Sequence, residues 1–342
     1  MKPRRPPYLT RSRFVRVLAL LTIALAVIVA SSTVVGSVHI DLLHALRGPS
    51  PDNIDGVILF RARLPRALLG ALVGGALAAA GAALQALMRN PLAEPHVVGV
   101  SGGAALGGVL ALVVGGSSGA SRAWGVPIGA FLGALGTMAV IYRLGTVRGR
   151  VEPYTLLLAG VVCNGFTGAL IMFVNAIADL FQAHGILFWL MGSLATQSYW
   201  LVLVVAGYTT VGVAWLVSHA RHFNALSLGE EGAAQLGIDV ARTRRAAFVA
   251  SSLLVGAAVS VSGMIGFVGL IVPHVARLLL GADYRLLLPA SVLLGASFLV
   301  VADTVARTAF GAVEIPIGVV TALCGGPFFI YLLRREGGRT LG

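Results

Sequence analysis

The chain has 342 residues, of which 57% are apolar and only 11% are charged, and its mean hydropathy is +0.91. Soluble globular domains carry about 25% charged residues. This composition therefore excludes a soluble domain and indicates a polytopic membrane protein. The formal net charge of +12 does not point to nucleic acid, because Lys and Arg collect on the cytoplasmic side of membrane proteins.

Counts of single residue types exclude further chemistry. Lys2 is the one lysine among 25 Lys and Arg residues, and a phosphate-binding P-loop needs its Lys, so we expect no P-loop here. Cys163 and Cys324 lie far apart without C-x-x-C spacing, which indicates packing residues rather than a thiolate metal site or a disulfide framework. The seven His show no H-E-x-x-H pattern, and we expect neither a catalytic nor a metal site in this chain.

The apolar stretches predict an all-α fold of about ten membrane-spanning helices, since a bilayer core takes roughly 20 apolar residues per helix. A basic leader, residues 1–13, precedes a first run that is long enough to span the membrane and is expected to be retained. The tail, 334–342, follows the last run. The expected spans, within one permease domain at 14–333, are 14–35, 65–87, 96–115, 124–142, 154–177, 199–218, 243–263, 267–280, 286–306 and 315–333.

An even number of spans places both termini on one side of the membrane. With both ends cytoplasmic, 19 of the 25 basic residues lie inside and six outside, as the positive-inside rule predicts. The window 267–280 is short and is expected to be a full, partial or tilted span. A faint repeat, in which 72–76 with Gly81 matches 254–258 with Gly263, agrees with an inverted repeat, although small-residue composition alone gives the same match.

Four polar or glycine-rich segments interrupt the apolar pattern. The loop 89–96 contains Asn90, Pro91, Glu94 and Pro95, and its two prolines forbid a continuous helix. The cytoplasmic loop 219–242 predicts a short helix with Ser227 and Glu230 as a capping box and Gly237 at its end. It is expected to be either a docking element for a cytoplasmic partner or a solvated loop helix.

The third segment lies on the outer side, and the fourth is a break between the seventh and eighth spans. Arg63, Arg66 and Arg307 run against the positive-inside rule. Arg307 follows Asp303 by four residues, so an ion pair on one helix face is one interpretation, and a rim that receives acidic groups of an external partner is the other. The glycine-rich segment 263–274 suits irregular backbone that lines a cavity or a gate.

Together these segments resemble the FecCD-type permeases of ABC importers, which serve vitamin B12, ferric-siderophore and haem uptake. The resemblance covers essentially the whole chain. The motifs that carry it are Arg63-Leu64-Pro65-Arg66, Gly81 to Gln85, Asn90-Pro91-Leu92-Ala93-Glu94-Pro95, Gly99 to Ala104, Trp189 to Ser193, Leu236-Gly237, Gly266 to Leu270 with Pro273-His274 and Arg277, and Glu314 to Gly318.

The resemblance implies a type II ABC importer permease in the inner membrane, working as a homodimer with two ATPase subunits and a periplasmic substrate-binding protein. It implies that ATP and Mg²⁺ bind to the ATPase and that this chain holds no cofactor and is not itself an enzyme. Arg63, Arg66 and Arg307 would meet acidic residues of the binding protein. The residues that would couple to the ATPase are Leu226, Ser227, Leu228, Gly229, Glu230, Glu231, Gly232, Ala233, Ala234, Gln235, Leu236, Gly237 and Ile238.

The cargo expected from the resemblance is an iron complex, a ferric siderophore or haem, with cobalamin as the alternative. An ion-coupled secondary transporter is the rival from another class. It would need acidic residues at mid-membrane, yet only Asp179 and Asp303 approach the predicted spans, both near outer ends. The sequence does not identify the chelate, the resting conformation or the gating residues.

Overall fold

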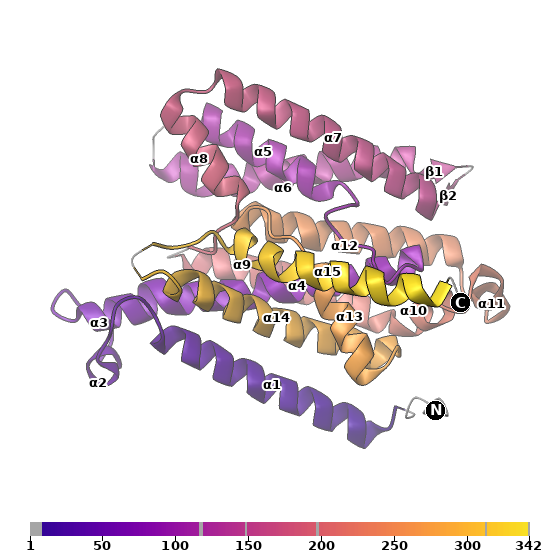
Figure 1. The fold of residues 1–342 in the computed structure, drawn as a ribbon, viewed down its shortest axis with the longest axis horizontal. Helices are drawn as coiled ribbons and strands as arrows, with labels where there is room; N and C mark the ends of the chain where they lie inside the picture. The colour runs from indigo at the N-terminus through magenta and orange to yellow at the C-terminus, as the bar shows by residue number, and fades with distance from the viewer. Residues whose placement is uncertain (1–8, 116–118, 148, 196–197, 312, 341–342) are drawn as a thin grey trace.

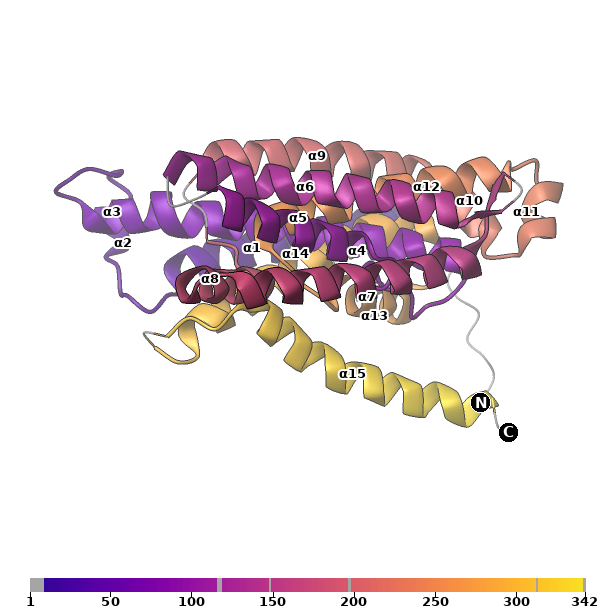
Figure 2. The same ribbon diagram turned by 90° about the horizontal axis from the view of Figure 1, so that it is seen from above.

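The computed structural model describes residues 9–115, 119–147, 149–195, 198–311 and 313–340. The chain forms an elongated bundle of helices whose axes run mostly along the long axis of the molecule (Figures 1 and 2). The elements of the first half are α1 (Arg11–Val34), α2 (Leu42–Ala45), α3 (Ile54–Val57), the π-helical η1 (Ile58–Arg63), α4 (Leu64–Met88), α5 (Val100–Val114), α6 (Gly119–Leu144) and the two-residue strands β1 (Thr146–Val147) and β2 (Arg150–Val151), which pair antiparallel.

The second half is helical throughout the described residues. Its elements are α7 (Pro153–Ile177), α8 (Leu180–Leu190), α9 (Tyr199–Ser218), α10 (Ala220–Leu226), α11 (Glu230–Gln235), α12 (Val240–Ser262), α13 (Val268–Leu280), α14 (Tyr284–Thr308) and α15 (Ile317–Thr340).

Each of the ten predicted spans contains a helix, which confirms the all-α membrane fold. Seven helical segments of the described chain are long and apolar enough to cross a membrane, and α5, α8, α13 and the first part of α15 are shorter apolar helices. Residues 1–8 of the predicted leader lie outside the described residues. The predicted tail begins inside α15, because that helix continues to Thr340.

Helix α4 forms the centre of the bundle. In its most apolar stretch 83% of the residues are buried, against 11% in α1. Small residues allow close contact with its neighbours: a Cβ on Gly74 would lie 2.2 Å from the carbonyl oxygen of Gly295 in α14, and one on Gly81 would lie 1.9 Å from that of Gly269 in α13. Helix α4 is thus held between α13 and α14 at backbone contact distance.

The bundle has two chemically distinct ends. One carries α2 and α3 and is called the α3 end; the other carries α10 and α11 and is called the α11 end (Figure 1). Helix α15 lies along one side of the bundle and is splayed from it, whereas α9 and α12 lie on the opposite side (Figure 2).

The segment between α4 and α5 differs from the prediction. Helix α5 begins at Val100 rather than at residue 96, and Gly99 before it has a φ of +93°, which a glycine adopts without strain. Residues 89–99 are therefore an irregular connection rather than the start of a span. Helix α13 has 13 residues and a length of about 20 Å, less than the roughly 30 Å of a bilayer core, so the short window is a partial span.

Candidate functional site

A buried ion cluster joins the helices at the α3 end. The Asp303 carboxylate, in a residue 2% exposed, accepts hydrogen bonds from Arg66 Nε at 3.0 and 3.1 Å and from Arg307 Nε at 3.1 Å. Arg307 is 6% exposed, and its Nη2 also donates to the backbone oxygen and to Oγ of Ser32, both at 3.1 Å. A buried charge is tolerated only when paired and hydrogen-bonded, and this cluster meets that condition across α1, α4 and α14.

The third predicted docking arginine is also buried. Arg63 is 5% exposed, and its guanidinium donates to the backbone carbonyls of Thr33 and Val34 in the last turn of α1 and of Val38 beyond it. These carbonyls lie at and beyond the end of a helix, where backbone acceptors lack helical partners. Arg63 therefore closes the C-terminal end of α1 against η1.

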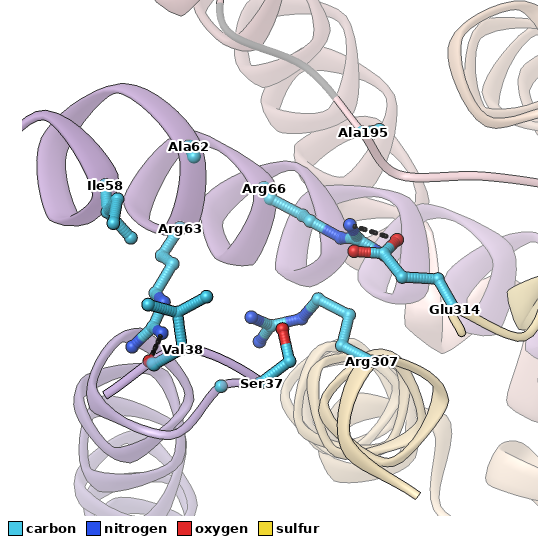
Figure 3. Close-up of a pocket in the computed structure, with 10 residues that line it drawn as sticks. Ser37, Val38, Ile58, Ala62, Arg63, Arg66, Ala195, Arg307 and Glu314 are labelled. Carbon is cyan, nitrogen blue, oxygen red and sulfur yellow. Dashed lines mark hydrogen bonds and ion pairs between the residues drawn. The ribbon is translucent and has the colours of Figure 1, made fainter. Parts of the chain in front are cut away.

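The three arginines line one cavity of about 330 Å³. Figure 3 shows them converging from η1, α4 and α14, with Glu314 beside Arg66. Arg66 Nη1 lies 2.9 Å from Glu314 Oε2, and the Glu314 side chain is 54% exposed. The structure thus brings the predicted residues together, but it holds their guanidinium groups in contacts within the chain. Of the three, Arg66 is the one paired with an exposed carboxylate, that of Glu314, which an acidic group from outside could replace.

The α11 end corrects one local prediction. Ser227 does not cap α11; it follows the last residue of α10, and its hydroxyl donates to the Asn224 carbonyl at 2.6 Å. Helix α11 begins after Gly229, whose φ of +104° allows the sharp turn between the helices. The predicted stop at Gly237 is correct: Gly237 N–H bonds to the Ala234 carbonyl and the next N–H to that of Ala233, the pattern of a Schellman cap.

Glu230 fixes α11 to the bundle. Its Oε1 lies 2.7 Å from Arg244 Nη2 in α12 and 3.6 Å from Arg89 Nη2 at the end of α4. By contrast, Glu231 is exposed and belongs to none of the ion pairs among the described residues. The two adjacent carboxylates thus differ in role, since one is used internally and the other faces outward.

Two leucines flank α11 and face outward. The exposed fractions of Leu228 and Leu236 are 70% and 64%. Exposed leucines are common singly, but here both sit at the ends of one short, capped helix at a tip of the molecule (Figure 1). This region, residues 228–236, is called the α11 tip; it exposes two leucine side chains and the Glu231 carboxylate, which belongs to no ion pair among the described residues.

Helix α10 is attached to α14 by a second polar contact. Asn224 Nδ2 donates to Asp283 Oδ1 at 2.8 Å, and Asn224 Oδ1 accepts from the backbone N–H of Tyr284 at 2.8 Å. Hydrogen bonds from the Arg285 side chain, and then from Asn224, lower the pKa of Asp283 to about 2. Asp283 remains ionised at neutral pH and binds the α10 turn to the start of α14.

The connection 89–99 reaches the start of α13. The backbone N–H of Phe267 donates to the Glu94 carboxylate, and Phe267 has a φ of +68°, which is uncommon for a non-glycine residue. A Cβ on Gly269 would lie only 2.7 Å from the Pro95 ring, so the two segments are in close contact. The Asn90 side chain accepts from the Leu92 N–H at 2.9 Å and holds the turn with Pro91. Glu94 therefore acts as an acceptor at the N-terminus of α13, where backbone donors lack helical partners.

Sequence reasoning missed several partners in these contacts. Asn224 and Asp283 carried no local signal, because the residues are far apart in the chain and neither belongs to a motif. Gln85 and Arg277, quoted only as parts of motifs, lie 3.2 Å apart, with Arg277 also 3.1 Å from the Tyr284 hydroxyl. Pairing between segments so distant in sequence is fixed by tertiary packing alone.

The described chain is a bundle of membrane-spanning helices with a buried ion cluster at one end and a short, capped helix at the other. Comparison with known proteins identifies its family: residues 18–335 match the FecCD transport family, and the chain belongs to it. It is a permease of the ABC importer class.

Two relatives and one solved structure illustrate the similarity. The chain is 46% identical to the cobalamin import system permease protein BtuC of Halobacterium salinarum, over 83% of this chain and 75% of that protein. It is 39% identical to the hemin transport system permease protein HmuU of Yersinia pestis, over 93% of this chain and 95% of that protein. An inward-facing putative metal-chelate type ABC transporter aligns with a TM-score of 0.80 at 34% identity, over 94% of this chain and 99% of that one.

Proposed function

We propose that this permease moves a bulky metal chelate across the inner membrane as a homodimer, with two ATPase subunits at the α11 end and a periplasmic binding protein at the α3 end. Both termini then lie in the cytoplasm. ATP and Mg²⁺ bind to the ATPase subunits, and this chain carries no catalytic group or cofactor of its own. The observation that carries the proposal is the α11 tip.

The α11 tip supports docking of a separate ATPase subunit. Its two exposed leucines and unpaired Glu231 stand on a helix that is fixed to the bundle through Glu230. At protein interfaces a few residues that fill well-packed pockets of the partner carry most of the binding energy. Closure of the ATPase subunits would move α11, and the contact of α10 with Asp283 would transmit that motion to α14.

Co-purification with the ATPase tests this assignment. Replacing Leu228 and Leu236 together with Ser is expected to release the ATPase subunit from the full complex and to abolish ATP-driven uptake in proteoliposomes. Leu43→Ser is the matched control for ATPase co-purification, because Leu43 is 80% exposed at the end of the bundle opposite to the proposed ATPase site. If uptake continues without any ATPase subunit, the chain is an ion-coupled secondary transporter instead.

The Glu231→Arg variant tests docking of the ATPase without disturbing the fold of the permease. Glu231 makes no ion pair within the described chain, so its reversal should uncouple ATP hydrolysis from transport without changing stability. Glu230→Arg should also destabilise α11, because it places a third cation beside Arg89 and Arg244. Normal coupled transport by the Glu231 variant would contradict the coupling role.

In the proposed homodimer, the outward-facing surface of α15 lies at the translocation path. Helix α15 is splayed from the bundle (Figure 2), and Leu323, Ile330 and Tyr331 on it are 59–69% exposed. A second copy would cover part of this apolar side. Cross-linking of single cysteines introduced on α15 into a Cys163→Ser, Cys324→Ser background is expected to give a dimer in native membranes, and its absence would contradict this arrangement.

For the cargo we propose an iron complex, a ferric siderophore or haem, and the similarity to HmuU supports haem as one form. Cobalamin is the second candidate, supported by the similarity to BtuC. Uptake of radiolabelled ferric siderophore, haem and cyanocobalamin by the complete reconstituted importer, with its own binding protein, separates the candidates. Transport of cyanocobalamin alone would reject the iron assignment.

A further inference from the structure

A groove on the side of the bundle away from α15 is lined by α9 and α12 (Figure 2). Its volume is about 480 Å³, within the 300–1,000 Å³ range of small-molecule sites. Its lining residues are Gly207, Tyr208, Val211, Gly212, Trp215, Ala246, Val249, Ala250, Leu253 and Leu254. No acidic side chain is among them, so the described groove is suited to a hydrocarbon chain.

Small side chains create the depth of the groove. A Cβ built on Gly207 would meet nothing within 4 Å, whereas one on Gly212 would meet Leu254 at 2.7 Å. The groove is therefore open beside Gly207, whereas near Gly212 the Leu254 side chain forms its floor. Tyr208 and Trp215 form the walls on α9 and lie seven residues apart, about two helical turns.

The end of the groove nearest the α11 end carries positive charge. Arg242 and Arg245 stand on α12 one turn before Ala246 and Val249, so each shares a helix face with a lining residue. Both arginines are exposed. Arg242 pairs with Asp239 at 3.1 Å, whereas Arg245 lies 6.0 Å from the centre of the Tyr142 ring and belongs to none of the ion pairs among the described residues.

The aromatic residue at this end adds a second feature of a membrane interface. Trp215 stacks on His219, with ring centres 4.0 Å apart. Trp is enriched at the level of lipid headgroups, where one side of the ring is apolar and the other is hydrated. The groove thus has an apolar lining, a Trp on its α9 wall and an exposed Arg one turn before its α12 lining residue Val249.

From this arrangement we propose that the groove between α9 and α12 binds one anionic phospholipid of the cytoplasmic leaflet, with an acyl chain beside Gly207 and the phosphate at Arg245. The leaflet assignment rests on the orientation given under Proposed function. The charge complementarity selects an anionic headgroup over a zwitterionic one, because a basic side chain near the surface contributes about 1 kcal/mol to binding of anionic lipid.

Native mass spectrometry of the purified chain tests the site without ATPase, binding protein or cargo, so its outcome is independent of the transport assignment. The delipidated protein is titrated with palmitoyl-oleoyl-phosphatidylglycerol and with the matching phosphatidylcholine. We expect one phosphatidylglycerol to be retained preferentially. Arg245→Gln should reduce that preference about fivefold, and Arg334→Gln, an exposed arginine on α15, should leave it unchanged.

Filling the groove tests the acyl chain separately. Gly207→Leu should lower retention of both lipids, because the new side chain occupies the open groove, and Ala250→Leu serves as a second blocking variant if the first does not fold. Equal retention of the two lipids by the wild type, equal effects of the two arginine variants, or unchanged retention in a folded blocking variant would each overturn the proposal.

Discussion

Removing the charge of Asp303 tests whether the ion cluster at the α3 end holds α1, α4 and α14 together. The carboxylate accepts from two arginines, and the residue is 2% exposed. In Asp303→Asn, Arg66 retains Glu314 as a partner, whereas Arg307 retains only the oxygens of Ser32. One buried guanidinium then has no carboxylate among the described residues.

The expected loss follows from that imbalance. Breaking a buried ion pair by removing one partner costs about 3–5 kcal/mol, because an uncompensated charge stays buried. The retained hydrogen bonds of Arg307 to Ser32 place the expected loss near the lower limit. Asp239→Asn is the matched control: its partner Arg242 is 87% exposed, and exposed pairs contribute only about 0.2–1 kcal/mol.

Unfolding of the detergent-purified protein by a denaturing detergent, followed by tryptophan fluorescence, measures both variants. The double variant Asp303→Asn with Arg307→Met should recover part of the loss, because it removes the unpaired charge as well. If Asp303→Asn unfolds within 1 kcal/mol of the control, about the upper limit for an exposed pair, the cluster does not have the assigned structural role.

The remaining predictions concern three other contacts. Glu314→Gln should raise affinity for an acidic binding-protein surface, because Arg66 loses its exchangeable carboxylate; unchanged affinity in a pull-down would contradict this. The folded pKa of Asp283 is about 2, below its ordinary 3.8, so its contribution to stability should be lost as pH falls from about 4 to 2, and acid titration of Asp283→Asn should lack that decline. Gly81→Ala should cost about 1–3 kcal/mol by overpacking, whereas Gly136→Ala, which meets nothing within 4 Å, should cost little in the same unfolding assay.

Much of the membrane fold is readable from the sequence because long apolar runs have few alternatives. Helices α4, α7, α9 and α14 each fall on a predicted window, since a chain in lipid must satisfy its backbone hydrogen bonds internally. Helix α8 was not predicted, because its 11 residues are too few to span and its sequence reads as part of an outer loop.

The site was predictable in its members but not in its contacts. Arg63, Arg66 and Arg307 were selected together because positive charge on the outer side needs a reason, and the structure places them around one cavity. That Arg63 donates to three carbonyls at and beyond the end of α1 depends on how α1 ends against η1, which no local pattern encodes. The prediction of a capping box at Ser227 is wrong because the turn between α10 and α11 requires a positive φ immediately before α11. Gly229 supplies that φ and takes the N-cap position.

The close fit of α4 between α13 and α14 has a consequence for sequence variation. Where two backbones touch at Gly74 and Gly81, neither rotation of α4 nor a larger side chain can be accommodated without moving a whole neighbouring helix. Homologous permeases that carry different cargoes are therefore expected to share this central helix nearly unchanged. Their differences should accumulate on α1, α7 and α15, whose outer surfaces can change without disturbing the centre.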